Sequence, residues 1–364
     1  MSRRTAPIPA PHAQPFQAGI QHPDLWLWDS WTLQGVEGDL HLYCLALSRT
    51  GFNGSSILPC QRNDHSFHIR HFISDDEGAS WRDAGMAIAP GNAEDGADTH
   101  NVWSGSVLAG RDGQILFAYT GIREVSAERP FLQTICIGRG TAPDAMTHAP
   151  PAAISCPARD YNQITDLGFY VGPRDRLGDL AGEEGGPIMA WRDPFLVRDH
   201  DGELNAFWAA KIGPTAPAMA RARLAETPEG VALAELLPPI ELPHASEYTQ
   251  SEVPKLSFDK GTQRWLLLIS ASDRMYEAQP DAEVHQHQRL YASDTLDGPW
   301  APALASGSLL TGLDYMFGSS LVGHDMSRGM LSLLGPYTEQ AAPEKQLSFP
   351  MVRNLDVTPA FRPA

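Results

Sequence analysis

The chain is short of cysteine, of basic residues and of long apolar runs, and each shortage excludes a class of protein. The cysteines Cys44, Cys60, Cys136 and Cys156 show no C-x-x-C spacing, which argues against zinc ribbons and thioredoxin-like centres. Four cysteines in 364 residues also make no disulfide framework, so we expect free, buried thiols. A membrane helix needs a run of about eighteen apolar residues, and no segment approaches that length, so no membrane partner is expected.

Basic residues are outnumbered by acidic ones. Lys and Arg total 27 against 44 Asp and Glu, and the formal charge of -17 argues against nucleic acid or an anionic membrane as a partner. A neutral small molecule such as a sugar suits this charge, although an acidic surface also serves solubility. Residues 1–19 lack the apolar segment of a secretory signal, so we expect a cytoplasmic protein, with export by a non-standard route left open.

Helical periodicity is scarce as well, and the chain is punctuated by proline and glycine instead. The 30 prolines and 32 glycines divide it into short segments, which is typical of an all-β protein. The predicted strands are Leu40–Ser48, Phe67–Ser74, Ile115–Thr120, Thr134–Gly138, Phe195–Val197, Asn205–Ala210, Trp265–Ser270, Arg289–Ser293 and Gly329–Leu334. Asp-Gly turns that predict hairpins lie at 111–113, 200–202, 259–261 and 296–299.

One turn indicates the kind of fold. Residues 74–81, Ser-Asp-Asp-Glu-Gly-Ala-Ser-Trp, fit the S-x-D-x-G-x-[ST]-W hairpin of β-propeller blades. We expect its Asp side chain to bond the turn backbone, its Gly to supply an unusual dihedral angle and its Trp to pack beneath.

The strand-rich blocks predict a five-bladed β-propeller with a central funnel. Its four-stranded blades are expected to begin near residues 25, 100, 188, 250 and 308. This division leaves a long loop at Asp160–Pro187, where binding determinants are expected. A pair of β-sandwiches is the alternative fold.

Three acidic residues lie in contexts that suit carbohydrate chemistry. They are Asp29 in Leu-Trp-Asp-Ser-Trp, Asp193 in Trp-Arg-Asp-Pro-Phe and Glu252 in Gln-Ser-Glu-Val-Pro-Lys. Carboxylates among apolar residues are costly to bury without a partner or a role. An indole packs on the C–H face of a sugar ring while carboxylates hold its hydroxyls. The ordinary alternatives are a turn-capping aspartate, a strand-edge ion pair and a solvated glutamate.

Local context predicts how two of these carboxylates are presented. Asp29 is expected to project from the first inner strand toward the central channel. Pro194 disfavours helical backbone before it, so Asp193 is expected to be extended. Arg192 would favour an ionised Asp193 if the two side chains approach.

Further candidates are weaker on their own. Trp103 and Ser104 offer an indole platform and a hydroxyl donor, although a core tryptophan is an equal alternative. Arg274 could donate two hydrogen bonds to a second sugar or form a surface ion pair. His65, His68 and His71 alternate faces if they lie on a strand, so no metal site is expected.

Taken in order, these motifs resemble glycoside hydrolase family 68, the levansucrases, inulosucrases and related β-fructofuranosidases. The matching segments are Trp28-Asp29-Ser30-Trp31, Trp103-Ser104-Gly105-Ser106, Arg192-Asp193-Pro194 and Glu252, within a resemblance from about Trp26 to about Gly335. The resemblance implies a five-bladed propeller whose site lies in a central funnel. Residues 25–364 are then expected to be one catalytic domain, preceded by an extension of residues 1–24.

The resemblance also implies roles. Asp29 resembles the nucleophile, Asp193 the transition-state stabiliser and Glu252 the acid/base. The residues that resemble the family's substrate contacts are Trp28, Trp103, Ser104 and Arg192 on the fructosyl side and Arg274 on the glucose side. Neither a metal nor an organic cofactor is implied.

The chain departs from the family at positions near the leaving group. Gln250 stands where a second Glu is frequent and is retained as a substrate-binding candidate; Val253 replaces an Arg, and Thr32 replaces a Pro. These changes make hydrolysis a stronger expectation than polymer synthesis. We therefore expect a retaining enzyme for sucrose or related β-fructofuranosides. The alternatives are an arabinofuranosidase-like propeller and a non-catalytic carbohydrate-binding propeller.

Overall fold

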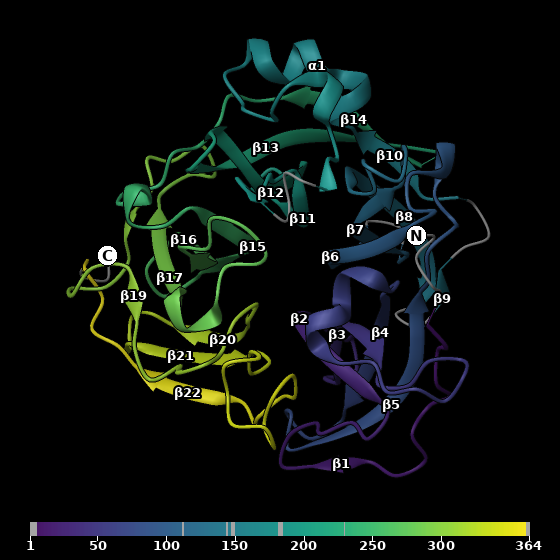
Figure 1. Ribbon diagram of the computed structural model, residues 1–364. Coiled ribbons are helices and arrows are strands. Elements are labelled where there is room, and N and C mark those ends of the chain that lie inside the picture. The colour runs from purple at the N-terminus through teal and green to yellow at the C-terminus, as the bar shows by residue number, and fades with distance from the viewer. Residues whose placement is uncertain are drawn as a thin grey trace.

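The computed structural model describes residues 6–110, 113–142, 145–146, 150–180, 185–228 and 230–361. Its strands form five antiparallel sheets that follow one another along the chain and stand in a ring (Figure 1). The protein is therefore a five-bladed β-propeller, as predicted. Within the described residues, no helix is long and apolar enough to cross a membrane.

The blades have the following elements. Blade 1 contains β1 (Phe16–Gln17), β2 (Leu25–Gln34), β3 (Leu40–Ser48), β4 (His68–Ser74) and β5 (Ser80–Ile88). Blade 2 contains β6 (Asn101–Ala109), β7 (Ile115–Arg123), β8 (Leu132–Ala142), β9 (Ala145–Met146) and β10 (Ala152–Ser155). Blade 3 contains β11 (Arg192–Arg198), β12 (Leu204–Gly213), β13 (Ala216–Thr227) and β14 (Gly230–Leu236).

Blade 4 contains β15 (Gln250–Asp259), β16 (Arg264–Ser272), β17 (Gln286–Ser293), β18 (Ala301–Pro302) and β19 (Leu309–Leu310). Blade 5 contains β20 (Ser320–Asp325), β21 (Met330–Leu334) and β22 (Arg353–Asp356). The helix α1 (Pro157–Asp166) lies outside the ring beside blade 3 (Figure 1). Short 3₁₀ helices occupy Pro59–Asp64, Glu94–Gly96, Arg174–Arg176, Ala245–Glu247 and Asp281–Glu283.

Blade packing explains the apolar character of the middle strands. Every residue of β3 is buried, because this strand lies inside its sheet and both faces of the blade are covered. Between blades 2 and 3, Trp191 and Trp208 pack edge to face at 5.2 Å within one apolar cluster that also holds Leu116. Uninterrupted apolar runs are expected for strands buried on both faces.

The ring is closed between the first and last blades. Ile20 and Phe349 exchange backbone hydrogen bonds at 2.8 and 3.0 Å, and the Leu27 amide donates to the Leu347 carbonyl at 3.0 Å. The Ser30 amide donates to the Gly318 carbonyl at 2.9 Å. The segment before β2 belongs both to blade 1, where β1 pairs with β5 on the outer edge, and to this closure, through Ile20.

The innermost strands share one irregularity that positions the site. Register shifts interrupt the pairing of each with its neighbour, between Leu27 and Ser30, Trp103 and Gly105, Arg192 and Phe195, Glu252 and Lys255, and Leu321 and Gly323. β-Bulges bend a strand and re-aim its side chains. The first four shifts coincide with the motifs that the sequence analysis singled out.

Two predictions about local structure, one for a strand and one for a turn, are confirmed. The strand Leu40–Ser48 has the predicted bounds. In the 74–81 turn the Asp76 carboxylate accepts from the Ser80 amide at 2.8 Å, Gly78 has a φ of +88°, and Trp81 is buried. The turn geometry was therefore predicted correctly. Residues 111 and 112 of the 111–113 turn lie outside the described residues.

Four expectations need correction. Blade 5 has three strands in the described chain, because residues 358–360 leave it and bond to 303–305 of blade 4. Its first strand begins at Ser320, not near 308, because Leu309–Leu310 pair with β17. The expected loop Asp160–Pro187 overlaps α1, which Pro157 initiates at a favourable position. Cys60 is exposed, although all four cysteines are free.

Candidate active site

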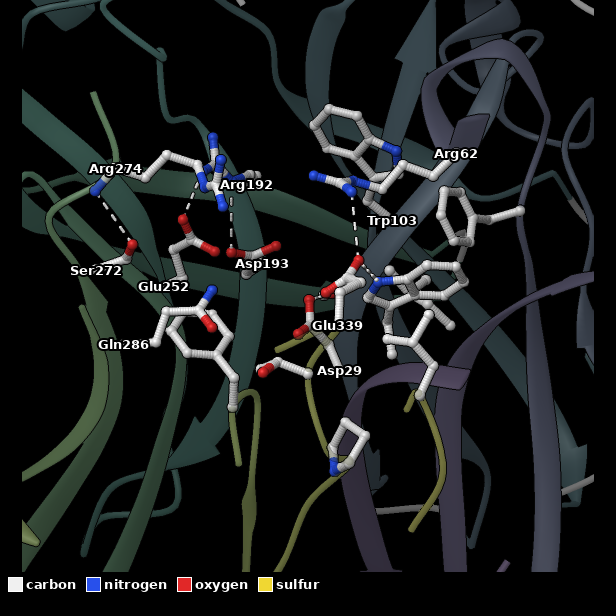
Figure 2. Close-up of a pocket in the computed structure, with 18 of the residues that line it drawn as sticks. Asp29, Arg62, Trp103, Arg192, Asp193, Glu252, Ser272, Arg274, Gln286 and Glu339 are labelled. Carbon is white, nitrogen blue, oxygen red and sulfur yellow. Dashed lines mark hydrogen bonds and ion pairs between the residues drawn. The ribbon is translucent and has the colours of Figure 1, made fainter. Parts of the chain in front are cut away.

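A pocket opens at the centre of the propeller and gathers the inner strands and several connecting loops. Eight of the nine predicted site residues line it: Trp28, Asp29, Trp103, Ser104, Arg192, Asp193, Glu252 and Arg274. Gln250 is not among the lining residues. Figure 2 shows the carboxyl groups of Asp29, Asp193 and Glu252 arranged around one space. We call this space the central pocket.

Asp29 is presented by the bulge in β2. The Ser104 hydroxyl, on β6 of the next blade, donates to Asp29 Oδ2 at 2.6 Å. Burial raises the pKa of Asp29 above its ordinary value, while the hydrogen bond from Ser104 lowers it and the Glu252 charge raises it. A hydroxyl donor at one carboxylate oxygen leaves the other available to a ligand. Asp29 lines the central pocket, so its side chain projects into the channel as predicted.

Gly318 makes the position of Asp29 possible. Its φ is +60°, and a Cβ placed on it would lie 2.3 Å from Asp29 Oδ1 and 2.8 Å from Asp29 Cα. The Gly318 amide donates to Ser270 Oγ of β16 at 2.8 Å, and its carbonyl accepts from the Ser30 amide of β2 at 2.9 Å, which holds this backbone against β2. Only glycine allows so close an approach at a positive φ.

Asp193 differs from its predicted backbone conformation. Its φ is +63°, so the residue is left-handed instead of extended, although Pro194 follows it. Two hydrogen bonds from other blades define this conformation: the Asp193 amide donates to Thr120 Oγ1 at 2.8 Å, and the Val253 amide donates to Asp193 Oδ2 at 3.2 Å. Tertiary contacts at a bulge therefore override the local preference before proline.

The ionisation of Asp193 also departs from the simple expectation. Arg192 does approach, with Nε 3.7 Å from Asp193 Oδ2, and this charge lowers the pKa of Asp193. Burial is the larger effect, however, and together with the charges of Asp29 and Glu252 it raises the pKa of Asp193 to about 7. The approach of Arg192 alone predicts an ionised Asp193, and it does not account for the larger effect of burial.

Arg192 joins two of the three carboxylates. Its Nη2 donates to Glu252 Oε1 at 3.0 Å, and the side chain is nearly buried at 9% exposure while Glu252 keeps 20%. Gln250 lies behind this pair: it accepts from Arg192 Nη2 at 3.5 Å and donates to the Arg274 carbonyl at 3.2 Å. Its amide therefore supports the arginines instead of facing the pocket.

The mouth of the pocket contains residues that the sequence analysis missed. Arg62 donates to the carboxylate of Glu339 (Figure 2) and to that of Glu277. The Trp28 indole donates to Glu339 Oε1 at 3.0 Å. Arg62 and Glu339 are 277 positions apart. No local motif surrounds either residue, so only the folded ring reveals the cluster.

Arg274 lines the pocket, but its guanidinium is also held by its own loop. Nη1 donates to the carbonyls of Glu277 and Gln279 at 3.1 and 2.7 Å, and Nη2 pairs with Asp281. The loop is thereby shaped around Arg274. Five N–H groups in a fixed fork still leave donors for a ligand.

This arrangement has the features of a site for breaking glycosidic bonds. Three carboxyl groups share one pocket but differ in exposure and partners, which is how separate acid and nucleophile roles arise. Trp28 and Trp103 supply flat apolar faces at the wall. In the described part of the chain, no group of three or more His, Cys, Asp or Glu side chains is placed to hold a metal ion.

Comparisons with known proteins agree with the fold. No protein-family model and no curated protein matches the chain. A Bacillus subtilis levansucrase double mutant in complex with oligosaccharides is similar at a TM-score of 0.63 and 16% identity, covering 94% of this chain and 87% of that one. A B. megaterium levansucrase mutant gives 0.63 and 16%, covering 99% and 91%.

A third solved structure, a levansucrase mutant complexed with sucrose, is similar at a TM-score of 0.62 and 16% identity, covering 93% of this chain and 86% of that one. The likeness extends over nearly the whole of both chains. At this identity the likeness shows the shared propeller fold.

Proposed function

We propose that this protein is a retaining glycosidase that cleaves β-fructofuranosides, with sucrose as the expected donor. One observation carries the proposal: Asp29, Asp193 and Glu252 come from three different blades and line a single pocket with two tryptophans and Arg192. Support also comes from the fold, which is shared with levansucrases, one of them complexed with sucrose.

In the first step Glu252 donates a proton to the glycosidic oxygen while Asp29 attacks the anomeric carbon of the fructosyl unit. The C–O bond to glucose breaks, glucose leaves with the proton, and a covalent fructosyl ester forms on Asp29. Asp193 holds ring hydroxyls and stabilises the positive charge that develops in the transition state. Such a double displacement retains the anomeric configuration.

In the second step Glu252 is a carboxylate and removes a proton from water, which attacks the fructosyl ester and releases fructose. Microscopic reversibility requires the same residue to act as acid and then as base. Arg192 contacts Glu252 at 3.0 Å and approaches Asp193, so it couples the position of the acid/base to that of the stabiliser.

Hydrolysis is proposed to exceed fructosyl transfer. Gln250, where the resembling family often has a carboxylate, is a weaker acceptor than an ionised Glu, and its amide is bonded to Arg192 and to the Arg274 carbonyl. Gln250 does not line the pocket, so it would act through Arg192 and Arg274, which line it. Arginines held less firmly would capture an acceptor sugar more weakly, which favours water in the second step. Product analysis at high sucrose tests this point: fructose as the main product supports it, and long fructan chains contradict it.

The deciding experiment measures the release of glucose and fructose from sucrose by the purified protein. Asp29→Asn should abolish release while leaving the thermal unfolding transition in place, because it removes the nucleophile with little change in shape. Sucrose cleavage at the wild-type rate by Asp29→Asn would refute the assignment.

A second variant separates the two carboxylate roles. Glu252→Gln should be nearly inactive on sucrose but should still react with a fructosyl donor whose leaving group needs no proton, and added azide should then restore turnover. Before azide is added, mass spectrometry should find the fructosyl ester on the peptide that contains Asp29. Turnover of arabinofuranosides but not fructosides would favour the arabinofuranosidase-like alternative, and binding of sugars without any turnover the non-catalytic one.

A further inference from the structure

A buried lysine that the proposed reaction does not use lies behind the carboxylates. Lys255 is on β15, 3% exposed, and its Nζ donates to the Val253 carbonyl at 3.0 Å. It is not among the residues that line the central pocket and instead faces a separate small cavity with Thr32, Phe195 and Ser320. Lysine is rarely buried to this degree unless its charge is matched.

Val253 connects this lysine to the site. Its φ is +46°, which is a strained conformation for a β-branched residue and requires support from its surroundings. In that conformation the Val253 amide donates to Asp193 Oδ2 at 3.2 Å, while the Val253 carbonyl accepts from Lys255. One strained residue thus lies between the ammonium group and a carboxylate of the pocket.

The charges around Lys255 are unequal in number. Asp29 on β2, Asp193 on β11 and Glu252 on its own strand are potential anions, whereas Arg192 on β11 is the other cation of the group. Arg192 contacts Glu252 and approaches Asp193. The direct partner of Asp29 is the neutral hydroxyl of Ser104. On β20, His324 bonds Ser257 and Asp259 of β15, and Asp325 pairs with Arg328.

Lys255 is expected to carry a proton at neutral pH. Burial lowers the pKa of Lys255 to about 8, and the charges of Asp29 and Asp193 limit that fall. The same interaction acts in reverse, since the Lys255 charge lowers the pKa of Asp29 against the effect of burial.

We propose that Lys255 is a positioning residue that acts through charge from behind the central pocket, keeping Asp29 ionised while Asp193 and Glu252 lie beside it. The proposal rests on the proposed function, in which the nucleophile has to be a carboxylate. Without Lys255, three interacting carboxyl groups would share a single cation, and the group would take up a proton at a higher pH.

The test compares pH profiles of kcat/KM on sucrose for the full chain and for Lys255→Met. We expect the acid limb to move upward by about one pH unit, the smallest shift typical of losing an adjacent opposite charge. The loss of activity should accordingly be about tenfold at pH values below the limb and small above neutrality. An equal loss at every pH would show a purely structural role and overturn the proposal.

Two further variants serve as controls. Lys255→Arg retains the charge and should keep the wild-type limb. Lys211 is as buried as Lys255, at 1% exposure, and its Nζ donates to the Pro214 carbonyl at 3.0 Å, but it lines neither cavity. Lys211→Met should lower the unfolding temperature without moving the limb. A shifted limb in Lys211→Met would contradict the proposal, because it would show that any buried lysine has this effect.

A measurement without substrate separates this proposal from the proposed function. Protein labelled with ¹³C at aspartate carboxyls is titrated by NMR, with the Asp29 signal assigned from its absence in Asp29→Asn. The Asp29 midpoint should be about one pH unit higher in Lys255→Met than in wild type; equal midpoints would overturn the proposal. A shifted midpoint in a protein that turns over no fructoside would refute the function alone.

The wild-type titration remains decisive if Lys255→Met does not fold. An Asp29 midpoint below pH 7 in the wild-type chain agrees with a carboxylate kept ionised beside Lys255. A midpoint above pH 7 would show that Lys255 does not keep Asp29 ionised and would overturn the proposal.

Discussion

At the scale of single residues, the central pocket depends on backbone conformations that cost stability. Asp193 and Val253 both have a positive φ, and the Val253 amide donates to the Asp193 carboxylate. Strained non-glycine residues of this kind cluster at functional sites, where the surrounding structure holds them in place. Gly318 also has a positive φ, but a glycine adopts this conformation without strain, and it has no Cβ that would meet Asp29.

Gly318→Ala should impair the chemistry more than the fold. The new methyl group would push Asp29 out of its place, and a misplacement of about 1 Å costs about 100-fold in rate. We expect kcat on sucrose to fall by about that factor. Gly54→Ala is the matched control, because Gly54 has a φ of +77° but open space around its Cβ position. A similar kcat loss in both variants would show that backbone strain alone is responsible.

Asp193 should make stability fall with rising pH. Its pKa of about 7 in the folded protein lies above the usual aspartate value, so the native state binds an extra proton between about pH 4 and pH 7. Stability is therefore lost as the pH rises through that window. Asp193→Asn should unfold a few degrees above wild type at pH 8, and this advantage should shrink toward pH 4.

Asp83 provides a contrast of opposite sign. It is buried, which raises its pKa, but hydrogen bonds from His22 and Arg70 outweigh burial and hold the pKa well below the usual range. Its contribution to stability is present above the unfolded pKa and is lost as the pH falls below about 4. Asp83→Asn should consequently unfold at a lower temperature than wild type at pH 8. A stabilised Asp83→Asn would contradict this account of both residues.

At the scale of elements, four of the five innermost strands contribute a pocket side chain at or beside an irregular position. The register shifts in β2, β6, β11 and β15 occur at Asp29, Ser104, Asp193 and the segment after Glu252. A regular strand would place alternate residues on fixed faces of the blade. The bulges instead bring side chains from different blades to a common level of the funnel.

Loops from three blades meet at the mouth through Arg62, which pairs with Glu277 and Glu339. Arg62→Met should release both carboxylates and loosen the wall on the side of Trp28. We expect KM for sucrose to rise about tenfold with a small change in kcat, which is the pattern of lost uniform binding. Arg328→Met is the control, because Arg328 is 77% exposed and pairs within its own turn. An unchanged KM in Arg62→Met would show that Arg62 and its two carboxylate partners do not contribute to substrate binding.

At the scale of the whole molecule, the site exists only when the ring is closed. Blades 1 and 5 meet through Ile20, Leu27, Leu347 and Phe349, and this seam is continuous with the backbone that supports Asp29. The contacts that close the ring join the two ends of the chain. Loop closure over such a separation costs entropy that the apolar seam has to offset.

Phe349→Ala should test the seam directly. Phe349 is 3% exposed within an apolar cluster that includes Phe16, Ile20 and Leu25. Truncating a buried Phe costs about 3–5 kcal/mol, so the free energy of unfolding measured in denaturant should fall by that amount. Met351→Ala, at a residue 55% exposed, should change it by at most about 0.5 kcal/mol. A similar loss in both variants would contradict a specific closure at Phe349.

The sequence by itself determined the all-β class, the division into five blades and the identity of eight residues that line the pocket. These features depend on short-range patterns: apolar runs bounded by Gly and Pro, an Asp-x-Gly turn, and acidic residues beside tryptophan. Such signals survive because each strand and hairpin carries its own preference. The position of Asp29 followed from the apolar strand around it, and the fold of the 74–81 turn from its own residues.

Only the tertiary structure decided the conformation of Asp193, the role of Gly318 and the meeting of Arg62 with Glu339. Each depends on a partner more than fifty positions away, brought near by ring closure. The raised pKa of Asp193 and the lowered pKa of Lys255 have the same origin, since burial and the neighbouring charges come from several blades. Local preference sets the strands, but desolvation and contacts between blades set the chemistry of the groups at their centre.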